Sequence, residues 1–120
     1  MWWMLGLIVV HWFADFVLQT DQQAQNKWNN TRALLEHTGS YALVFLLIAS
    51  VVMPLHPWLA LSFALITGII HTGTDYVTSK ITHRLWNEKK VHEFFVVIGF
   101  DQVLHYIQLV LTLHYLTGLI

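Results

Sequence analysis

Three pairs of histidine and aspartate, each pair four residues apart, stand within long hydrophobic stretches of this sequence. They are "HWFAD" (His11 and Asp15), "HTGTD" (His71 and Asp75) and "DQVLH" (Asp101 and His105). Residues four apart lie about 40° apart around a helix, so each pair shares one helical face. Histidine nitrogens and carboxylate oxygens are ligands of zinc, iron and manganese sites that lack cysteine, and this chain contains no cysteine. We therefore expect these six residues to bind one or two divalent metal ions: zinc, manganese or iron.

A hydrophobic stretch is a costly environment for a carboxylate. An aspartate at the centre of a membrane helix costs about 2.5–3.5 kcal/mol on insertion scales, so it usually faces the protein interior and pairs with another group. Three ionised carboxylates repel one another in a dry site, and a divalent cation removes that repulsion. Two alternatives stay open: a histidine and aspartate relay for protons, or hydrogen-bonded pairs that only hold helices together.

The composition indicates that the elements carrying these pairs are membrane helices. The chain is 56% hydrophobic and 11% charged, against about 25% charged in ordinary soluble domains. No Asp, Glu, Lys or Arg occurs from His37 to Thr74, or from Gln102 to Ile120. Soluble helices interrupt apolar runs with charge because one face meets water. We therefore expect a multi-pass protein of the lipid bilayer.

A membrane span needs about 20 mostly apolar residues at a rise of about 1.5 Å per residue. Four segments qualify, residues 2–19, 37–53, 58–82 and 94–118, with Pro54 and Pro57 breaking the helix between the second and third. The predicted fold is an all-α, integral membrane four-helix bundle that forms a single domain, 1–120. The polar stretch after the first span predicts a short interfacial helix with Thr20 or Asp21 as its N-cap, broken near Asn29.

The basic residues predict the orientation of the bundle. Lys27 and Arg32 lie in the first loop, and the other four, Lys80, Arg84, Lys89 and Lys90, lie at or in the third. Lys and Arg concentrate in cytoplasmic loops, so both termini are expected on the non-cytoplasmic side. The net charge of −1 gives no indication of nucleic-acid binding.

This topology places the three pairs at one depth. Counted from the ends of the spans, all six residues lie roughly 6–17 Å below the cytoplasmic interface, so they can converge. His37 enters from the same side as an accessory ligand or general base, and Asp15 and Asp75 are the other candidate catalytic residues. Four polar residues are expected to bind substrate: Gln19, Lys27, Lys80 and Gln102. Lys80 lies off the face of His71, and Gln102 is about 100° from Asp101 around its helix.

The same motifs resemble a family of small bacterial and phage membrane proteins catalogued as a domain of unknown function. The family pattern is H-x-x-A-D-F-x-L-Q, then H-x-x-x-D, then D-Q-x-x-H, and "HWFADFVLQ", "HTGTD" and "DQVLH" match it. The resemblance covers nearly the whole chain. It implies a bacterial inner-membrane location but no particular chemistry. A looser similarity links the pattern to predicted membrane-bound metal-dependent hydrolases.

The leading hypothesis is a metal-dependent hydrolase that acts on a lipid or phosphate-bearing substrate at the cytoplasmic membrane surface. A bound metal lowers the pKa of its water to about 7, which supplies a nucleophile without serine or cysteine. The alternatives are a cation or proton transporter or channel subunit, and a non-catalytic accessory membrane protein. The expected partners are the lipid bilayer and, because four spans form a small unit, a possible homo-oligomer.

Overall fold

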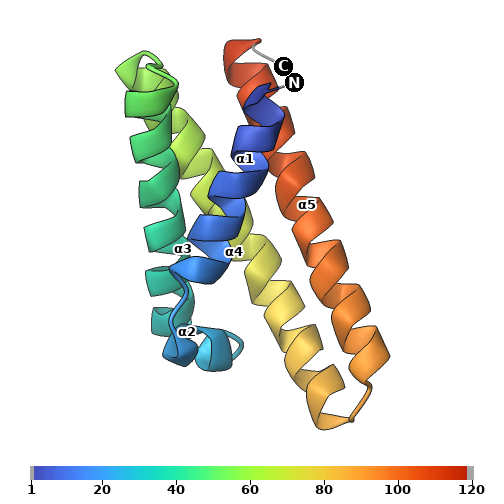
Figure 1. Ribbon diagram of the computed structural model, residues 1–120. Coiled ribbons are helices and arrows are strands. Elements are labelled where there is room, and N and C mark those ends of the chain that lie inside the picture. The colour runs from blue at the N-terminus through green and yellow to red at the C-terminus, as the bar shows by residue number, and fades with distance from the viewer. Residues whose placement is uncertain (1, 119–120) are drawn as a thin grey trace.

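A computed structural model describes residues 2–118 as an all-helical chain, with no β-strand in that range. Its elements are, in order, α1 (Trp2–Trp12), the π-helical turn η1 (Phe13–Val17), α2 (Asp21–Asn26), α3 (Thr31–Leu47), the π-helical turn η2 (Ile48–Val52), α4 (Pro57–Asn87) and α5 (Val91–Thr117). The start of α1 and the end of α5 lie together at one end of the molecule, called here the terminal end (Figure 1). The opposite end, with α2 and the α4–α5 turn, is called the loop end. The predicted all-α class is confirmed.

Three helices are long and apolar enough to cross a membrane: Thr31–Val52 (α3 with η2), Pro57–Asn87 (α4) and Val91–Thr117 (α5). Each begins or ends outside the predicted span, because hydropathy marks only the apolar part of a helix. The side chain of Asn30, for example, accepts the N–H of Ala33 at 3.2 Å and starts α3 six residues before the predicted span. The first predicted span corresponds to a shorter apolar helix, Trp2–Val17, which reaches about 24 Å against a hydrocarbon core of about 30 Å.

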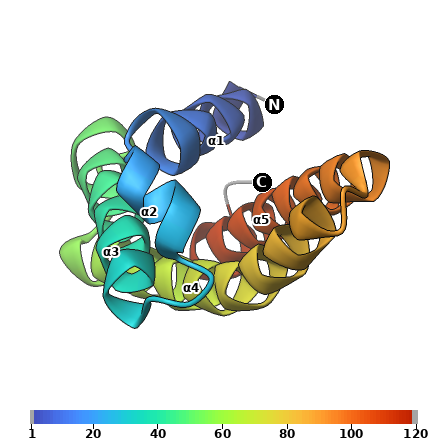
Figure 2. The same ribbon diagram turned by 90° about the horizontal axis from the view of Figure 1, so that it is seen from below.

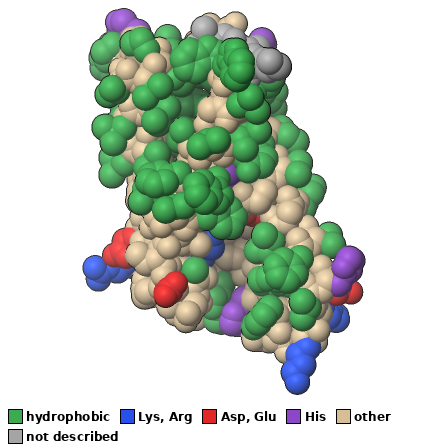
Figure 3. Space-filling view, viewed as in Figure 1, with side chains coloured by type: hydrophobic (Ala, Val, Ile, Leu, Met, Phe, Trp, Pro, Cys, Tyr) green, Lys and Arg blue, Asp and Glu red, His purple; other side chains and the backbone are tan. Residues whose placement is uncertain are grey.

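The outer surface of the bundle is hydrophobic and its interior is unusually polar. Leu43, Val51 and Ile69 are 62–74% exposed, whereas buried polar or charged residues are as numerous as buried hydrophobic ones among the described residues. Hydrophobic side chains cover much of the face in Figure 3, most densely toward the terminal end, and the Lys, Arg, Asp and Glu side chains visible there lie toward the loop end. Membrane proteins show this arrangement, because lipid solvates apolar side chains and polar groups face inward.

The short helix predicted after the first span is α2. Thr20 is its N-cap: its side chain accepts the N–H of Gln23 at 3.2 Å, and the Gln23 side chain accepts the N–H of Thr20 at 3.1 Å. The helix ends at Asn26, and α3 begins after the predicted break. Because α2 packs against α3, the C-terminal residue of α2 and the loop that follows it lie beside the bundle.

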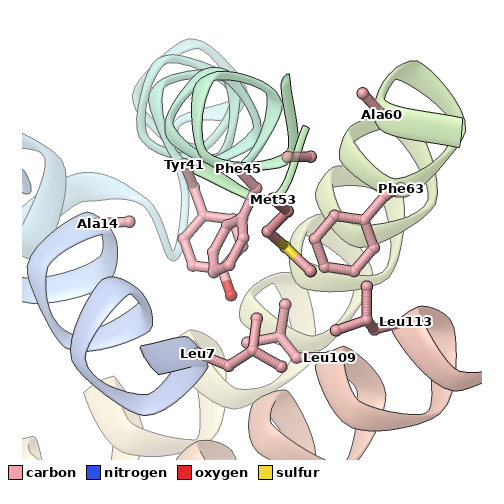
Figure 4. Close-up of a cluster of buried hydrophobic side chains, with 10 residues drawn as sticks. Leu7, Ala14, Tyr41, Phe45, Met53, Ala60, Phe63, Leu109 and Leu113 are labelled. Atoms are coloured by element: carbon pink, nitrogen blue, oxygen red, sulfur yellow. The ribbon is translucent and has the colours of Figure 1, made fainter. Parts of the chain in front are cut away.

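A hydrophobic core packs between α1, α3, α4 and α5 toward the terminal end (Figure 4). Its largest fully buried side chains are Tyr41, Phe45, Phe63, Leu109 and Leu113. Beside it, α3 and α4 come close together at Gly68, where an added Cβ atom would lie 2.9 Å from the Cβ atom of Ala42. Nearer the loop end, in the middle of the bundle, the buried side chains are polar instead.

Candidate metal centre

Histidine and aspartate side chains from four regions of the chain meet inside the bundle. The structure brings together all six predicted ligands and His37: His11 of α1, Asp15 of η1, His37 of α3, His71 and Asp75 of α4, and Asp101 and His105 of α5. Each is buried, with at most 8% of its surface exposed. The four-residue spacing puts each pair on one face of its helix, and the packing of α3 and α5 against α4 turns those faces toward each other.

Four of these side chains place one atom each at the corners of a distorted tetrahedron, all within 4.8 Å of one another. Nε2 of His37 lies 3.0 Å from Oδ1 of Asp15 and 3.3 Å from Oδ2 of Asp75. Nε2 of His71 lies 3.3 Å and 3.6 Å from the same two oxygens and 3.3 Å from Nε2 of His37. Zinc bonds of about 2.0–2.1 Å in a tetrahedron need ligand atoms about 3.3–3.4 Å apart. These residues, which include the three predicted catalytic residues, therefore have the geometry to hold such an ion.

His105 approaches this set without being part of it. Its Nδ1 lies 3.1 Å from Nδ1 of His71, and its Nε2 lies 3.2 Å from Oδ1 of Asp75 and 3.3 Å from Oδ2 of Asp101. If Nε2 of His71 is to bind a metal, the ring proton must be on Nδ1, which then donates a hydrogen bond to Nδ1 of His105. Neutral His105 then carries its own proton on Nε2 and donates to the two carboxylates, so every close contact of this ring becomes a hydrogen bond.

A second set of ligand atoms, from Asp15, Asp101 and His105, also lies within 4.8 Å of one another. It shares Asp15 with the first set. Both imidazoles could bind metal through Nε2 only if both Nδ1 atoms carried a proton, and two N–H groups pointing at each other across 3.1 Å repel. With neutral rings, the two sets are therefore alternatives, and a single metal site follows from the geometry.

His11 belongs to a separate hydrogen-bonded chain that holds the first set in place. Its Nε2 lies 2.7 Å from Oε1 of Gln102, and because an amide oxygen only accepts, Nε2 carries the proton and donates the hydrogen bond. Nδ1 then accepts a hydrogen bond from the hydroxyl of Tyr41 at 2.8 Å. The amide of Gln102 then donates to Oδ2 of Asp15 at 3.2 Å and to Oδ2 of Asp101 at 3.1 Å. Both ring nitrogens of His11 are thus engaged with other side chains, although the sequence predicted this residue as a ligand.

Lys27 provides the positive charge closest to the carboxylates. Its Nζ lies 2.8 Å from Oδ2 of Asp75, the atom that forms one corner of the tetrahedron. Thr78 donates its hydroxyl to Oδ1 of Asp101 at 2.6 Å. With three carboxylates and one ammonium in contact, the cluster carries excess negative charge unless protons or a cation compensate for it. A divalent cation would both fill the tetrahedron and balance the charge.

A cavity of about 640 Å³ connects this cluster to the loop end. Asp15, Asp101, Gln102 and Lys27 line its polar part, and its apolar lining comes from Phe16, Trp28, Trp86, Phe94, Phe95 and Ile98. Its lining residues come from η1 and the α2 region and from α4 and α5. Figure 2 shows the ribbons of α2, α4 and α5 from below. Gln19 and Ser79 also line the cavity. The Oε1 atom of Gln19 and the Oγ atom of Ser79 are buried and have no hydrogen-bond partner among the described residues.

Three of the four predicted substrate-binding residues, Gln19, Lys27 and Gln102, line this cavity, but Lys80 does not. The side chain of Lys80 points to another face of α4. There its Nζ donates to the backbone oxygen of Trp28 at 2.8 Å and lies 3.8 Å from the centre of the Tyr76 ring. The structure therefore places Lys80 outside the site that the sequence assigned to it.

Comparison with known proteins identifies one relationship. The sequence model of a family described as "Protein of unknown function (DUF3307)" matches residues 3–120. No curated protein and no solved structure matches the chain. The looser similarity to membrane-bound hydrolases is not shown by these comparisons.

Proposed function

The chain belongs to the DUF3307 family of proteins of unknown function, and we propose that it is a membrane-embedded hydrolase that uses one divalent metal ion. The observation that carries this proposal is the tetrahedral set of Asp15, His37, His71 and Asp75 beside an open cavity. Tetrahedral sites with nitrogen and oxygen ligands suit zinc best, although manganese and iron accept the same donors. When bound, such an ion supplies a water molecule of low pKa as the nucleophile.

The chain's own residues would orient the ligands. Gln102 donates to Asp15, and His105 faces Asp75, so each metal-binding carboxylate is held by a neighbouring side chain. Such supporting hydrogen bonds fix the direction of a ligand's lone pairs and raise metal affinity. His11 supports the same network one step further away, through Gln102.

The cavity lining supports a substrate that is both anionic and apolar. The ammonium group of Lys27 can turn from Asp75 toward a phosphate, because this side chain lines the cavity and is 18% exposed. The unpartnered Gln19 Oε1 and Ser79 Oγ can hydrogen-bond the polar part of the same molecule. Aromatic and aliphatic side chains form the rest of the wall. A lipid that bears a phosphate group combines these two properties.

The membrane placement completes the proposal. All six Lys and Arg residues belong to the segments at the loop end, and positive residues concentrate on the cytoplasmic side. The cavity would then open at the cytoplasmic surface of a bacterial inner membrane, with both termini on the other side and α1 as a fourth, short membrane helix. The metal site would lie below the headgroup layer, within reach of a lipid phosphate.

A cation or proton transporter is the second candidate, and one observation favours it. Beyond His105, the amide of Gln108 donates to Thr67 at 3.2 Å and to Thr112 at 3.1 Å, so polar groups continue toward the terminal end. The hydrophobic core lies at the same level, however, with Leu109 and Leu113 fully buried. This closure is why we favour a site that opens on one side only.

Metal binding is tested on the purified protein in a neutral detergent. After chelation and titration with zinc, we expect about one ion per chain and a rise in melting temperature, since a ligand that binds the folded state stabilises it. Asp75→Asn and His37→Ala should lose both effects, whereas His92→Ala, an exposed residue at the loop end, should keep them. A wild-type protein that stays folded and binds no zinc, manganese or iron would refute the proposal.

Two further assays separate the candidates. In vesicles containing phosphatidic acid and phosphatidylglycerol, the hydrolase should release metal-dependent products that mass spectrometry detects and that Asp75→Asn abolishes. In proteoliposomes with a pH or zinc gradient, a transporter should give a metal-dependent flux. Flux without product formation would replace the hydrolase with the second candidate.

A further inference from the structure

A second cavity, of about 560 Å³, lies at the loop end between the α2–α3 loop and α4. Residues that line it include the cations Lys27, Lys80 and Arg84, together with His83, Tyr76 and Asn29. Among the described residues, no Asp or Glu lines this cavity, in contrast to the cavity of the metal centre. A lining with cations, an amide and aromatic rings but no carboxylate favours an anionic ligand.

Lys80 is held at this cavity in a fixed direction. Its Nζ donates one hydrogen bond to the backbone oxygen of Trp28, at 2.8 Å, and lies 3.8 Å from the centre of the Tyr76 ring. An ammonium group has three N–H donors, so this hydrogen bond leaves donors for a ligand. Arg84, one helical turn further along α4, adds a guanidinium that forms an ion pair with Glu88 through Nε at 2.7 Å. Guanidinium groups bind phosphate through two N–H groups at once.

The start of α3 contributes to the same positive environment. Thr31, its first residue, lines the cavity. The N-terminus of a helix carries a partial positive charge, which favours anions, although the side chain of Asn30 already accepts the N–H of Ala33 here. This helix of 17 residues therefore adds to the attraction that Lys80 and Arg84 exert.

Two aromatic residues and Lys27 line both this cavity and the cavity of the metal centre. The rings of Trp28 and His83 stack with their centroids 3.6 Å apart and an angle of 11° between their planes. The stacked pair and Lys27 therefore form a wall that the two cavities share. No metal-binding carboxylate lines the second cavity, and Lys27, which lines both cavities, lies between it and Asp75, 2.8 Å from Oδ2 of that residue.

From these features we propose that the second cavity binds the phosphate headgroup of an anionic phospholipid. The neighbouring surface of α4 is apolar and exposed: Val77 is 53% exposed, Ile81 is 43% exposed and Tyr76 is 53% exposed. The acyl chains of a lipid can lie along this surface while its phosphate contacts Lys80. A free phosphate ion would make no use of the apolar surface. The inference rests on the membrane placement in the proposed function, but not on its metal or its reaction.

The experiment measures lipid retained by the metal-free protein in neutral detergent, by native mass spectrometry. With equal amounts of phosphatidylglycerol and phosphatidylcholine added, we expect one phosphatidylglycerol per chain to be retained preferentially. Lys80→Gln and Arg84→Gln should each lower its occupancy at least fivefold, and Lys80→Arg should restore most of it. Lys89→Gln is the matched control, because it removes the same charge from an exposed residue outside the cavity.

The outcomes also distinguish the two sources of phosphate. Phosphatidylglycerol that depends on Lys80 and persists against excess inorganic phosphate supports the lipid. Binding of inorganic phosphate that depends on Lys80, without any preference between the two lipids, overturns the lipid in favour of a free anion. Equal losses in Lys80→Gln and Lys89→Gln overturn the site altogether. Since the assay contains no metal, its result is independent of the metal titration that tests the proposed function.

Discussion

The rings of His71 and His105 face each other through Nδ1 atoms 3.1 Å apart. When both rings are neutral, one Nδ1 carries a proton and donates a hydrogen bond to the other. This contact gives the two histidines different roles, although both belong to four-residue pairs with an aspartate. His71 can offer its other nitrogen to a metal, and His105 then donates its own proton to Asp75 and Asp101.

We therefore predict different effects of removing the two rings. His71→Ala deletes a ligand and should abolish zinc binding. His105→Ala removes a supporting hydrogen bond and should weaken zinc binding about 10–100-fold, as supporting residues do in other metal sites. Competition with a chromogenic chelator measures both affinities. Two ions per wild-type chain, or equal losses in the two variants, would contradict the single-site arrangement.

Lys27 and a metal ion compete for the same oxygen atom, Oδ2 of Asp75. We predict that Lys27→Met raises the affinity for zinc, because the metal no longer has to displace the ammonium group from Asp75. The same change should lower hydrolysis of an anionic lipid, since the cation that would bind its phosphate is lost. Lys89→Met serves as the control, and an affinity for zinc that falls in Lys27→Met would refute this competition.

Gln102 connects His11 to two carboxylates and should be important for stability as well as for metal binding. Gln102→Ala leaves the buried His11 N–H without its acceptor, which costs about 1–3 kcal/mol for an unsatisfied buried group. Thermal unfolding in detergent should show a lower melting temperature for this variant. Gln22→Ala, an exposed residue on α2, should leave the melting temperature unchanged, and equal melting temperatures for both variants would show that the network contributes little.

Gly68 and Gly99 form a matched pair for testing how closely α3 and α4 pack. An alanine at Gly68 would place its Cβ 2.9 Å from Ala42, whereas the Cβ of an alanine at Gly99 would meet no other part of the described chain within 4 Å. Alanine in place of a helical glycine otherwise stabilises by about 0.5–1 kcal/mol. We predict that Gly99→Ala raises the melting temperature and Gly68→Ala lowers it. A rise in both variants would mean that the helices can separate without loss.

Much of the site was predictable because helical spacing and depth are both encoded locally. The four-residue spacing put His71 and Asp75 on one face, and the alternating direction of the helices put the pairs at one level. Lysine and arginine counts likewise predicted that the pairs lie nearer the basic loops than the two termini. These arguments need only the rise and pitch of a helix, so they hold before any contact between helices is known.

The contacts between helices could not be read from the sequence. Gln102 lies about 100° from Asp101 around α5, yet η1 packs close enough for this side chain to reach Asp15. Tyr41 follows His37 by four residues, and this spacing is the signal that could have identified it, but only its contact with His11 gives it a role. The π-helical turn that carries Asp15 has no recognisable signal in "FADFV".

The hydrophobic core at the terminal end has a kinetic consequence for any reaction at this site. Leu109, Leu113 and Phe63 are fully buried there, so a molecule that enters through the cavity leaves by the same opening. Substrate and product would share one route and exclude each other from the centre. Product inhibition competitive with substrate is therefore expected, and turnover would depend on how quickly the product returns to the bilayer.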